Sequence, residues 1–282
     1  MEEELTPLRK YQLTEMKILK EFMRVCEEND LTWWIGWGTL LGAVRHKGFI
    51  PWDDDIDIGM PVEDYLKFRQ LCREGALGDE FFFSCHADCI YDMIYNQGIG
   101  LKNTTSLPKK YADTPANWGI RIDIFAYSPA PGFDSPESKK FKKLEKRFDQ
   151  LASRYYYKKE VQTTSGIRKL YCKFMSRGTD EQHLRQWNAF EQKYLAGWDF
   201  KDRRCFAASP GRVTAAAFEE TVMLPFEDLM LPAPAGYDQV LTDLYGPTYM
   251  ELPPEEDRWY HSGGESDDMY VSHTEPWTKF LK

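Results

Sequence analysis

The sequence lacks any apolar run long enough to span a bilayer, and its first residues lack a basic segment followed by an apolar one. No membrane span or secretory signal is therefore expected. Basic side chains are also too few to balance the acidic ones, at 36 against 45, and the net charge is −9. Such a charge argues against a protein that coats nucleic acid, so an anionic substrate must be met by local positive charge or by a metal ion.

Paired cysteines are missing as well. The six cysteines show no C-x-x-C spacing, and we interpret them as reduced thiols of a cytoplasmic protein. Cys85-His86 and Cys89 resemble half of a zinc site, but no second ligand pair follows at a finger-like spacing. The thiol interpretation is favoured.

What the sequence has is a globular composition, with 42% hydrophobic and 15% aromatic residues in a chain of 282. Thr6-Pro7 indicates the start of an amphipathic helix that runs to about Asn29. A second helix is expected from Gly36 and ends at Gly48. Alternation and helical spacing further predict strands at 31–35, 56–60, 81–84, 98–102 and 119–125, the last bounded by Pro129 and Pro131, and a helix at 62–72.

Residues 135–195 change in character and read as helices, which predicts an inserted helical subdomain. After it, strands are expected at 203–207 and 222–231, followed by a helix at 237–245 that ends at Gly246-Pro247. The fold class is therefore α/β (α+β), a mixed sheet core with a helical insertion. We divide the chain into a catalytic core at 1–134, the insertion at 135–200 and a C-terminal segment at 201–282 that completes the core.

The most informative stretch is the aspartate-rich run from Asp53 to Gly59. On a strand, Asp55 and Asp57 project to one face while the interleaved isoleucines enter the core on the other. Two like charges so close repel, and a divalent cation such as Mg²⁺ or Mn²⁺ relieves the repulsion. The alternative is a solvated loop, which the apolar alternation disfavours.

Asp123 is the candidate third carboxylate, because Ile122 and Ile124 flank it as isoleucines flank Asp57. It is expected either as a metal ligand or as the base that accepts a proton from an acceptor hydroxyl. An ion pair or a strand-end cap is the structural alternative. Gly38-Thr39, at the start of a helix, offers N–H groups and a hydroxyl to phosphate oxygens, although such a pair is usually only a cap.

The run from Gly38 to Ile58 resembles the signature of the LicD family of phosphocholine transferases. The resemblance extends to residues 101–105, 119–125 and 237–258, and to His261 beyond them; the stretch 126–129 departs from the expected pattern. It implies a nucleotidyltransferase-like fold related to fukutin-type proteins.

The resemblance also implies a reaction. A sugar hydroxyl of a cell-surface glycan, such as lipopolysaccharide or teichoic acid, or of a lipid-linked precursor attacks a CDP-linked donor such as CDP-choline, and CMP leaves. The group moved is phosphocholine, phosphoethanolamine or a polyol phosphate. Two other readings stay open: a nucleotidyltransferase that uses an NTP and releases pyrophosphate, and a non-catalytic protein that binds glycans or nucleotides.

The family pattern carries specific roles onto this sequence. The metal and catalytic residues are Asp55, Asp57 and Asp123. The candidate substrate-binding residues are Gly38, Thr39, Arg45, His46, Trp52, Lys102 and His261, and for Arg45, His46 and Lys102 the alternative is a surface ion pair. Trp52 is the candidate to hold a quaternary ammonium by cation–π attraction, although most tryptophans are simply core residues.

A basic run at 139–147 stands out in this acidic chain. Such a run is usually a solvated helix face. The alternative is peripheral contact with an anionic membrane at the inner face, where a lipid-linked acceptor lies.

Overall fold

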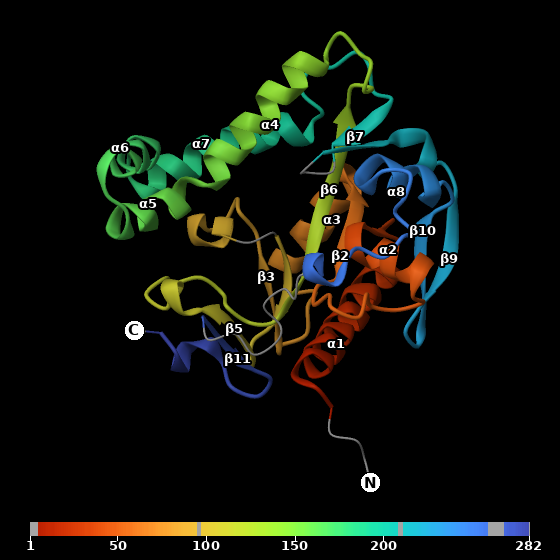
Figure 1. The fold of residues 1–282 in the computed structure, drawn as a ribbon, viewed down its shortest axis with the longest axis horizontal. Helices are drawn as coiled ribbons and strands as arrows, with labels where there is room; N and C mark the ends of the chain where they lie inside the picture. Colours follow the sequence, from red (N-terminus) through yellow and green to blue (C-terminus); the bar gives the residue numbers. More distant parts are fainter. Residues whose placement is uncertain (1–4, 95–96, 208–210, 259–267, 282) are drawn as a thin grey trace.

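The computed structural model describes residues 5–94, 97–207, 211–258 and 268–281 (Figure 1). Its centre is a mixed sheet in the order β1-β2-β6-β4-β3, which β7 and β8 extend from the far end of β6. Within the described chain β2 and β6 run parallel, and the other neighbours in this sheet are antiparallel. The strands are β1 (Trp34–Ile35), β2 (Asp57–Pro61), β3 (Phe81–Ser84), β4 (Gly98–Leu101), β6 (Arg121–Ala130), β7 (Cys205–Ala207) and β8 (Arg212–Thr214).

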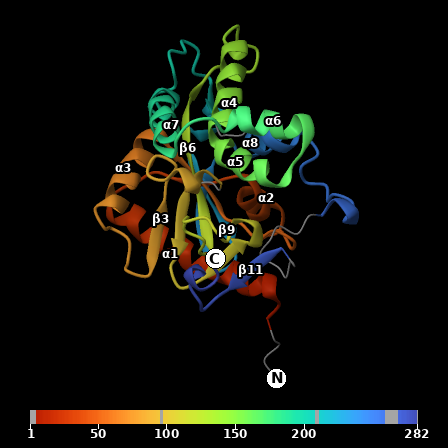
Figure 2. The ribbon, with the colours of Figure 1, turned by 90° about the vertical axis from the view of Figure 1, so that its left-hand side faces the viewer.

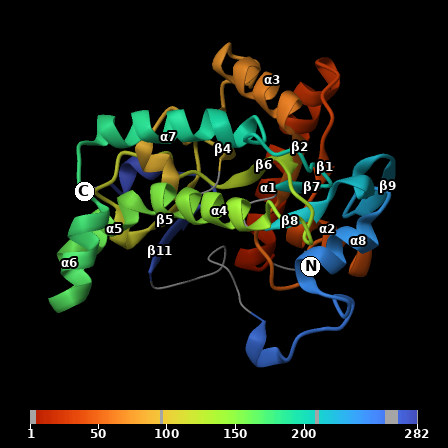
Figure 3. The same cartoon turned by 90° about the horizontal axis from the view of Figure 1, so that it is seen from above.

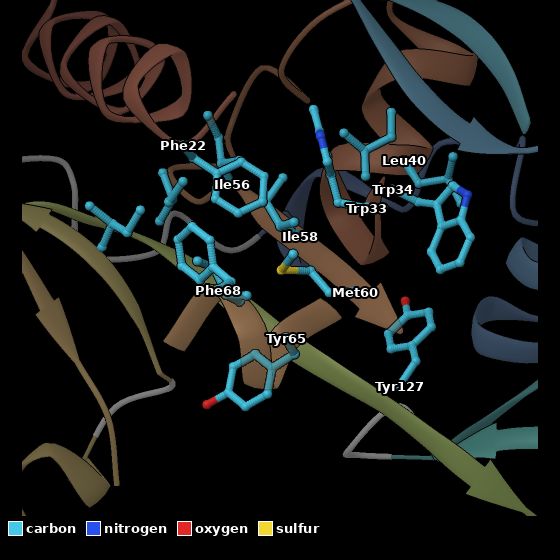
Figure 4. Close-up of a cluster of buried hydrophobic side chains, with 14 of the residues drawn as sticks. Phe22, Trp33, Trp34, Leu40, Ile56, Ile58, Met60, Tyr65, Phe68 and Tyr127 are labelled. Atoms are coloured by element: carbon cyan, nitrogen blue, oxygen red, sulfur yellow. The ribbon is translucent and has the colours of Figure 1, made fainter. Parts of the chain in front are cut away.

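Three helices of the N-terminal region pack around this sheet: α1 (Pro7–Glu28), α2 (Trp37–Arg45) and α3 (Val62–Arg73). The predicted start of α1 is confirmed, because Thr6 Oγ1 accepts the N–H of Arg9. Figure 4 shows the core that the helices form with β2, where Phe22, Phe68 and Ile58 meet. The second helix ends at Arg45, earlier than Gly48, and the strand expected at 31–35 is only two residues long.

The predicted helical insertion consists of α4 (Ser138–Ala152), α5 (Arg154–Thr163), α6 (Gly166–Met175) and α7 (Asp180–Leu195). Helices α4 and α7 run side by side, and α6 projects at the end away from the sheet (Figures 2 and 3). A buried ion pair at 2.9 Å between Arg69 of α3 and Glu191 of α7 joins the insertion to the core. The domain limits at 134 and 200 stay a prediction.

The C-terminal segment returns to the core. The single strand expected at 222–231 is wrong: the chain forms a hairpin of β9 (Thr221–Phe226) and β10 (Leu229–Pro234). Glu227 has a left-handed φ of 54° in the turn, a conformation that is uncommon for glutamate and that the sequence therefore did not predict. Helix α8 (Tyr237–Tyr245) has the predicted bounds, and Gly246 after it has a φ of 84°.

Three further strands escaped the sequence patterns. Besides β8, they are β5 (Thr105–Pro108) and β11 (Met269–Ser272), which pair antiparallel with each other. The strand expected to end before Pro129 instead runs through it to Ala130. At Pro129 the strand pairs with β7, while its pairing with β2 stops at Tyr127. A proline without an N–H is tolerated where a strand has one neighbour.

Short 3-10 helices complete the described chain at Ile90–Ile94, Lys109–Tyr111, Ala215–Phe218, Glu255–Asp257 and Trp277–Lys279. The six cysteines are all free thiols. None of the helices in the described ranges has the length and apolar character needed to cross a bilayer.

Candidate active site

Asp57 is fixed by three contacts to the turn that opens α2. Its N–H donates to Thr39 Oγ1 at 2.8 Å, and its carbonyl accepts the N–H of Gly36 at 2.9 Å. The N–H of Gly38 donates to its carboxylate. The first N–H groups of a helix favour negative charge, so the start of α2 both holds this side chain and partly compensates its charge.

Asp123 lies directly beside Asp57. The two residues are register partners on the parallel strands β2 and β6, and the N–H of Asp123 donates to the carbonyl of Ile56 at 2.8 Å. Neighbouring strands are about 4.8 Å apart, so partnered side chains share one face. Ile56 and Ile58 are fully buried on the opposite face, as the alternation predicted.

Asp55 precedes the strand rather than belonging to it, since β2 begins at Asp57. Its charge nevertheless acts on Asp57. Burial first, and then the charges of Asp55 and Asp123, raise the pKa of the Asp57 carboxyl well above its usual range. The structure therefore brings the three predicted carboxylates together. Their role as ligands stays a prediction.

Asp53 enlarges the acidic cluster. Burial, followed by the charge of Asp55 and a hydrogen bond between the two side chains, raises the pKa of Asp53 to about 8. Without a cation, this crowding favours the protonated form of Asp53. A β-carbon added to Gly38 would lie 2.6 Å from Asp53 Oδ2, which explains why the second residue of the helix has no side chain.

Glu15 is a further acid that the sequence analysis missed. It is 1% exposed on α1, and its Oε2 has no hydrogen-bond partner within the described residues. Burial, and then the charges of Asp55 and Asp54, raise the pKa of this carboxyl well above its usual value. One signal was available, because Glu15 falls between Tyr11 and Leu19 on the otherwise apolar stripe of the helix.

These residues suit a hard divalent cation. The cluster offers carboxylate oxygens only, which Mg²⁺ and Mn²⁺ prefer, and Glu15 Oε2 is a buried acceptor with nothing to accept. In the described ranges no three His, Cys, Asp or Glu side chains already converge as metal ligands.

Three predicted substrate-binding residues lie at the other end of α2 and just after it. Arg45 Nη1 donates to the carbonyl of Tyr249 at 2.9 Å, so this guanidinium holds the C-terminal segment. Partial burial, and then Arg45, lower the pKa of His46, which packs edge-on against Trp52. The guanidinium of Arg258 lies 4.9 Å from the Trp52 ring centroid, so a protein cation already contacts this ring. Contact of these side chains with a substrate stays a prediction.

Lys102 is not brought to the carboxylates. Asp123 pairs with Gly98, and Lys102 follows four residues later, just beyond the end of β4 and about 13 Å away at a strand's rise per residue. Its ammonium donates to the carbonyl of Asp79 at 2.8 Å, on the β3 side of the sheet. His261 lies outside the described residues.

The structure adds two aromatic residues at the acidic cluster. Tyr245 at the end of α8 is 43% exposed, and desolvation of its hydroxyl, followed by the charges of Asp57 and Asp53, raises the pKa of that hydroxyl. Trp37 begins α2 with a φ of 36°, and its ring packs at a tilt of 38° against Phe125, with 4.3 Å between ring centroids. A non-glycine residue in this region is strained, and such strain often marks functional sites. The sequence offered one indication of Tyr245, because this residue lies in the stretch 237–258 that resembles the family.

Comparison with known proteins places this site in a family. A domain model described as the LicD/FKTN/FKRP nucleotidyltransferase domain matches residues 30–133, which include Asp55, Asp57 and Asp123. Lipopolysaccharide cholinephosphotransferase LicD of Haemophilus influenzae is 30% identical over 270 residues, covering 90% of this chain and 95% of that protein. Ribitol 5-phosphate transferase FKRP, of human and of mouse, is 38% identical over 71 residues, covering 23% of this chain and 14% of those proteins.

The mixed sheet with its matched domain defines a nucleotidyltransferase-like protein. The chain belongs to the LicD family and is a transferase. The similarity to the Haemophilus protein extends over nearly the whole chain, so it includes the helical insertion as well as the acidic site.

Proposed function

We propose that this transferase moves a phosphocholine-type group from a CDP-linked donor to a sugar hydroxyl of a cell-surface glycan or its precursor, with release of CMP. The names of two relatives, a cholinephosphotransferase and a ribitol 5-phosphate transferase, support a substituted phosphate as the group moved. The observation that carries the proposal is the register pair of Asp57 and Asp123 beside the N-terminus of α2.

In the proposed reaction the hydroxyl oxygen of the sugar attacks the phosphorus that bears choline. The bond from this phosphorus to the oxygen of the CMP phosphate breaks, and its electron pair leaves with CMP. The hydroxyl proton passes to Asp123 or to water. A bound Mg²⁺ or Mn²⁺ would supply charge neutralisation for the pyrophosphate, held by Asp55, Asp57 and Asp123.

Other residues of the site hold the carboxylates in position. The N–H groups at the start of α2 orient Asp57, and Thr39 fixes the strand that carries it. Gln12 supports the neighbouring turn by donating to the carbonyl of Asp53 at 2.8 Å. Because β2 and β6 are paired strands of a sheet, their carboxylates are preorganised rather than flexible, which is how electrostatic stabilisation is made effective.

The two proposed roles of Asp123 can be separated. If it is a ligand, Asp123→Asn weakens Mn²⁺ binding, as followed by titration of free Mn²⁺. If it accepts the proton, the variant lowers kcat with the Mn²⁺ affinity unchanged.

The test is a panel of donors. Protein, Mg²⁺ and an acceptor glycan are incubated with CDP-choline, CDP-ethanolamine or CDP-ribitol, and CMP is measured. We expect CMP from at least one donor, and none after chelation of the metal or with Asp57→Asn. Pyrophosphate released from an NTP would favour a nucleotidyltransferase, and binding without turnover would favour a non-catalytic protein.

We further propose that the protein works in the cytoplasm and that the basic face of α4 contacts an anionic membrane. In support, six basic side chains of this helix are exposed while its apolar face is buried against the rest of the insertion. They are Lys139, Lys140, Lys142, Lys143, Lys146 and Arg147.

A further inference from the structure

Helix α6 carries an apolar surface that the described chain leaves largely exposed, although Tyr157 contacts the edge of it at Tyr171. The side chains of Ile167, Leu170 and Phe174 are 87%, 67% and 61% exposed, and Tyr171 beside them is 45% exposed. Their spacing puts them on one face of the helix. We call these four residues the α6 patch. Contiguous exposed apolar side chains of this size mark an interaction surface.

The face of α6 opposite the α6 patch packs against the rest of the insertion. Cys172 is completely buried there, and α6 packs against α5. The helix lies at the far end of the insertion from the sheet (Figures 1 and 3). The α6 patch is therefore not a leftover of the core, because the residue that anchors the helix points the other way.

The charge around the α6 patch has one sign. From Gln162 to Arg177 the chain contains four basic residues and no acidic one, although the whole protein has a net charge of −9. Arg168 is paired with Glu160 of α5. Lys169 and Lys173 have no ion-pair partner among the described residues. Arg177, whose guanidinium lies 5.1 Å from the Phe174 ring centroid, and Lys173 therefore flank the α6 patch with positive charge, whereas Lys169 lies near the opposite face of the helix.

We propose that α6 docks on an anionic phospholipid bilayer, with the α6 patch entering the interface and the flanking basic residues meeting the headgroups. Apolar side chains on one face and lysine or arginine beside them are the features by which a helix lies in the membrane interface. This proposal is independent of the transferase activity, since it concerns binding to lipid alone.

A second copy of this chain fits less well. A symmetric dimer through α6 would place the same patch on both partners, so Lys173 and Arg177 would face basic residues of the other copy. An anionic bilayer instead attracts these charges. The exposed basic face of α4, in the same insertion, adds further attraction of the same sign.

Vesicle co-sedimentation of the full-length protein tests the proposal. We expect binding to vesicles of equal phosphatidylglycerol and phosphatidylcholine, weakened by salt, and little binding to phosphatidylcholine alone. Ile167→Ser combined with Phe174→Ser should reduce binding on the order of a hundredfold, since two large apolar side chains no longer enter the interface. Lys173→Gln with Arg177→Gln should reduce it roughly 25-fold, or about fivefold per basic residue.

The matched control is Met223→Ser with Met230→Ser on the β9–β10 hairpin, where both side chains are 52% exposed. This variant should bind vesicles as the unaltered protein does, and thermal melting should show that all variants are folded. Failure of the unaltered protein to bind anionic vesicles would overturn the proposal. So would α6 variants that bind normally, or a concentration-dependent dimer that these variants abolish in the absence of vesicle binding.

Discussion

The acidic site and the helical insertion handle charge in opposite ways. At the site, Asp57 and Glu15 are buried among other carboxylates, and their pKa values rise first because burial removes water from the charged form and then because the neighbouring charges are of the same sign. On the insertion, the lysines of α4 stand in solvent. Buried like charges are costly unless a ligand compensates them, whereas exposed charges cost little and are screened by salt. The first arrangement suits a cation and the second suits a surface.

The largest effect on activity is expected from a substitution at the acidic site, where the charges are buried. Asp57→Asn should lower kcat/KM by roughly a thousandfold, because it removes a preorganised charge at the reacting group. The melting temperature of the metal-free protein should hold or rise, since repulsion is relieved. Asp149→Asn, an exposed acid on α4, is the control and should change neither. Normal turnover by Asp57→Asn would remove the basis of the site assignment.

Gly38→Ala tests whether the turn that opens α2 sets the geometry of the carboxylates. The added β-carbon would lie 2.6 Å from Asp53 Oδ2, so the side chain of Asp53 or the turn must shift. Displacement of about 1 Å in a reacting group costs roughly 10²-fold in rate, and we expect a loss of this order. Gly75→Ala would be a poor control because of its positive φ; Gly78→Ala, with its nearest neighbour at 3.6 Å, should leave kcat/KM unchanged.

Glu15→Gln should weaken Mg²⁺ or Mn²⁺ binding by roughly tenfold, since removing carboxylates near a metal commonly costs 10–100-fold in affinity. It should also raise the stability of the metal-free protein, because a carboxyl whose ionised form is disfavoured by burial and by Asp55 is replaced by a neutral amide of the same shape. Isothermal titration with Mn²⁺ measures the first effect, and thermal melting the second. Unchanged affinity would make Glu15 a core residue without a part in cation binding.

The smallest and most gradual effect is expected for the stability of the metal-free protein as the pH changes. The folded, metal-free protein holds a proton on Asp53 up to about pH 8, whereas the unfolded chain releases it near pH 3.8. Stability from this group is therefore complete below the lower value and is lost as pH rises through the upper one. Calorimetry should show the melting temperature falling over this range, less so with Mg²⁺ present or in Asp53→Asn. A flat profile without metal would contradict the crowding of carboxylates.

The sequence predicted the central pair of acids for a local reason. Side chains alternate along a strand, so isoleucines on both sides of Asp57 and of Asp123 place these carboxylates opposite the core. The same reasoning failed at 222–231, where two apolar strands joined by Glu227 and Asp228 look like one. A turn formed by a residue with an unusual φ leaves no periodic signature.

Distance along the chain explains what escaped prediction at the site. Glu15 reaches the acidic cluster from α1, and Tyr245 reaches it from α8, long after the insertion. Lys102, close in sequence to Asp123, lies on another part of the sheet because β4 runs antiparallel to β6. Residues far from Asp123 in the sequence thus lie at the site, and a residue near it in the sequence lies elsewhere.

The sequence by itself determined the two carboxylate strands, the helix that opens beside them and the helical character of the insertion, because each follows from a period of a few residues. Only the tertiary structure decided that Asp57 and Asp123 are register partners, that Glu15 and Tyr245 join them, and that α6 leaves its apolar face largely exposed. These features depend on which distant segments pack together, and no local pattern of side chains records that choice.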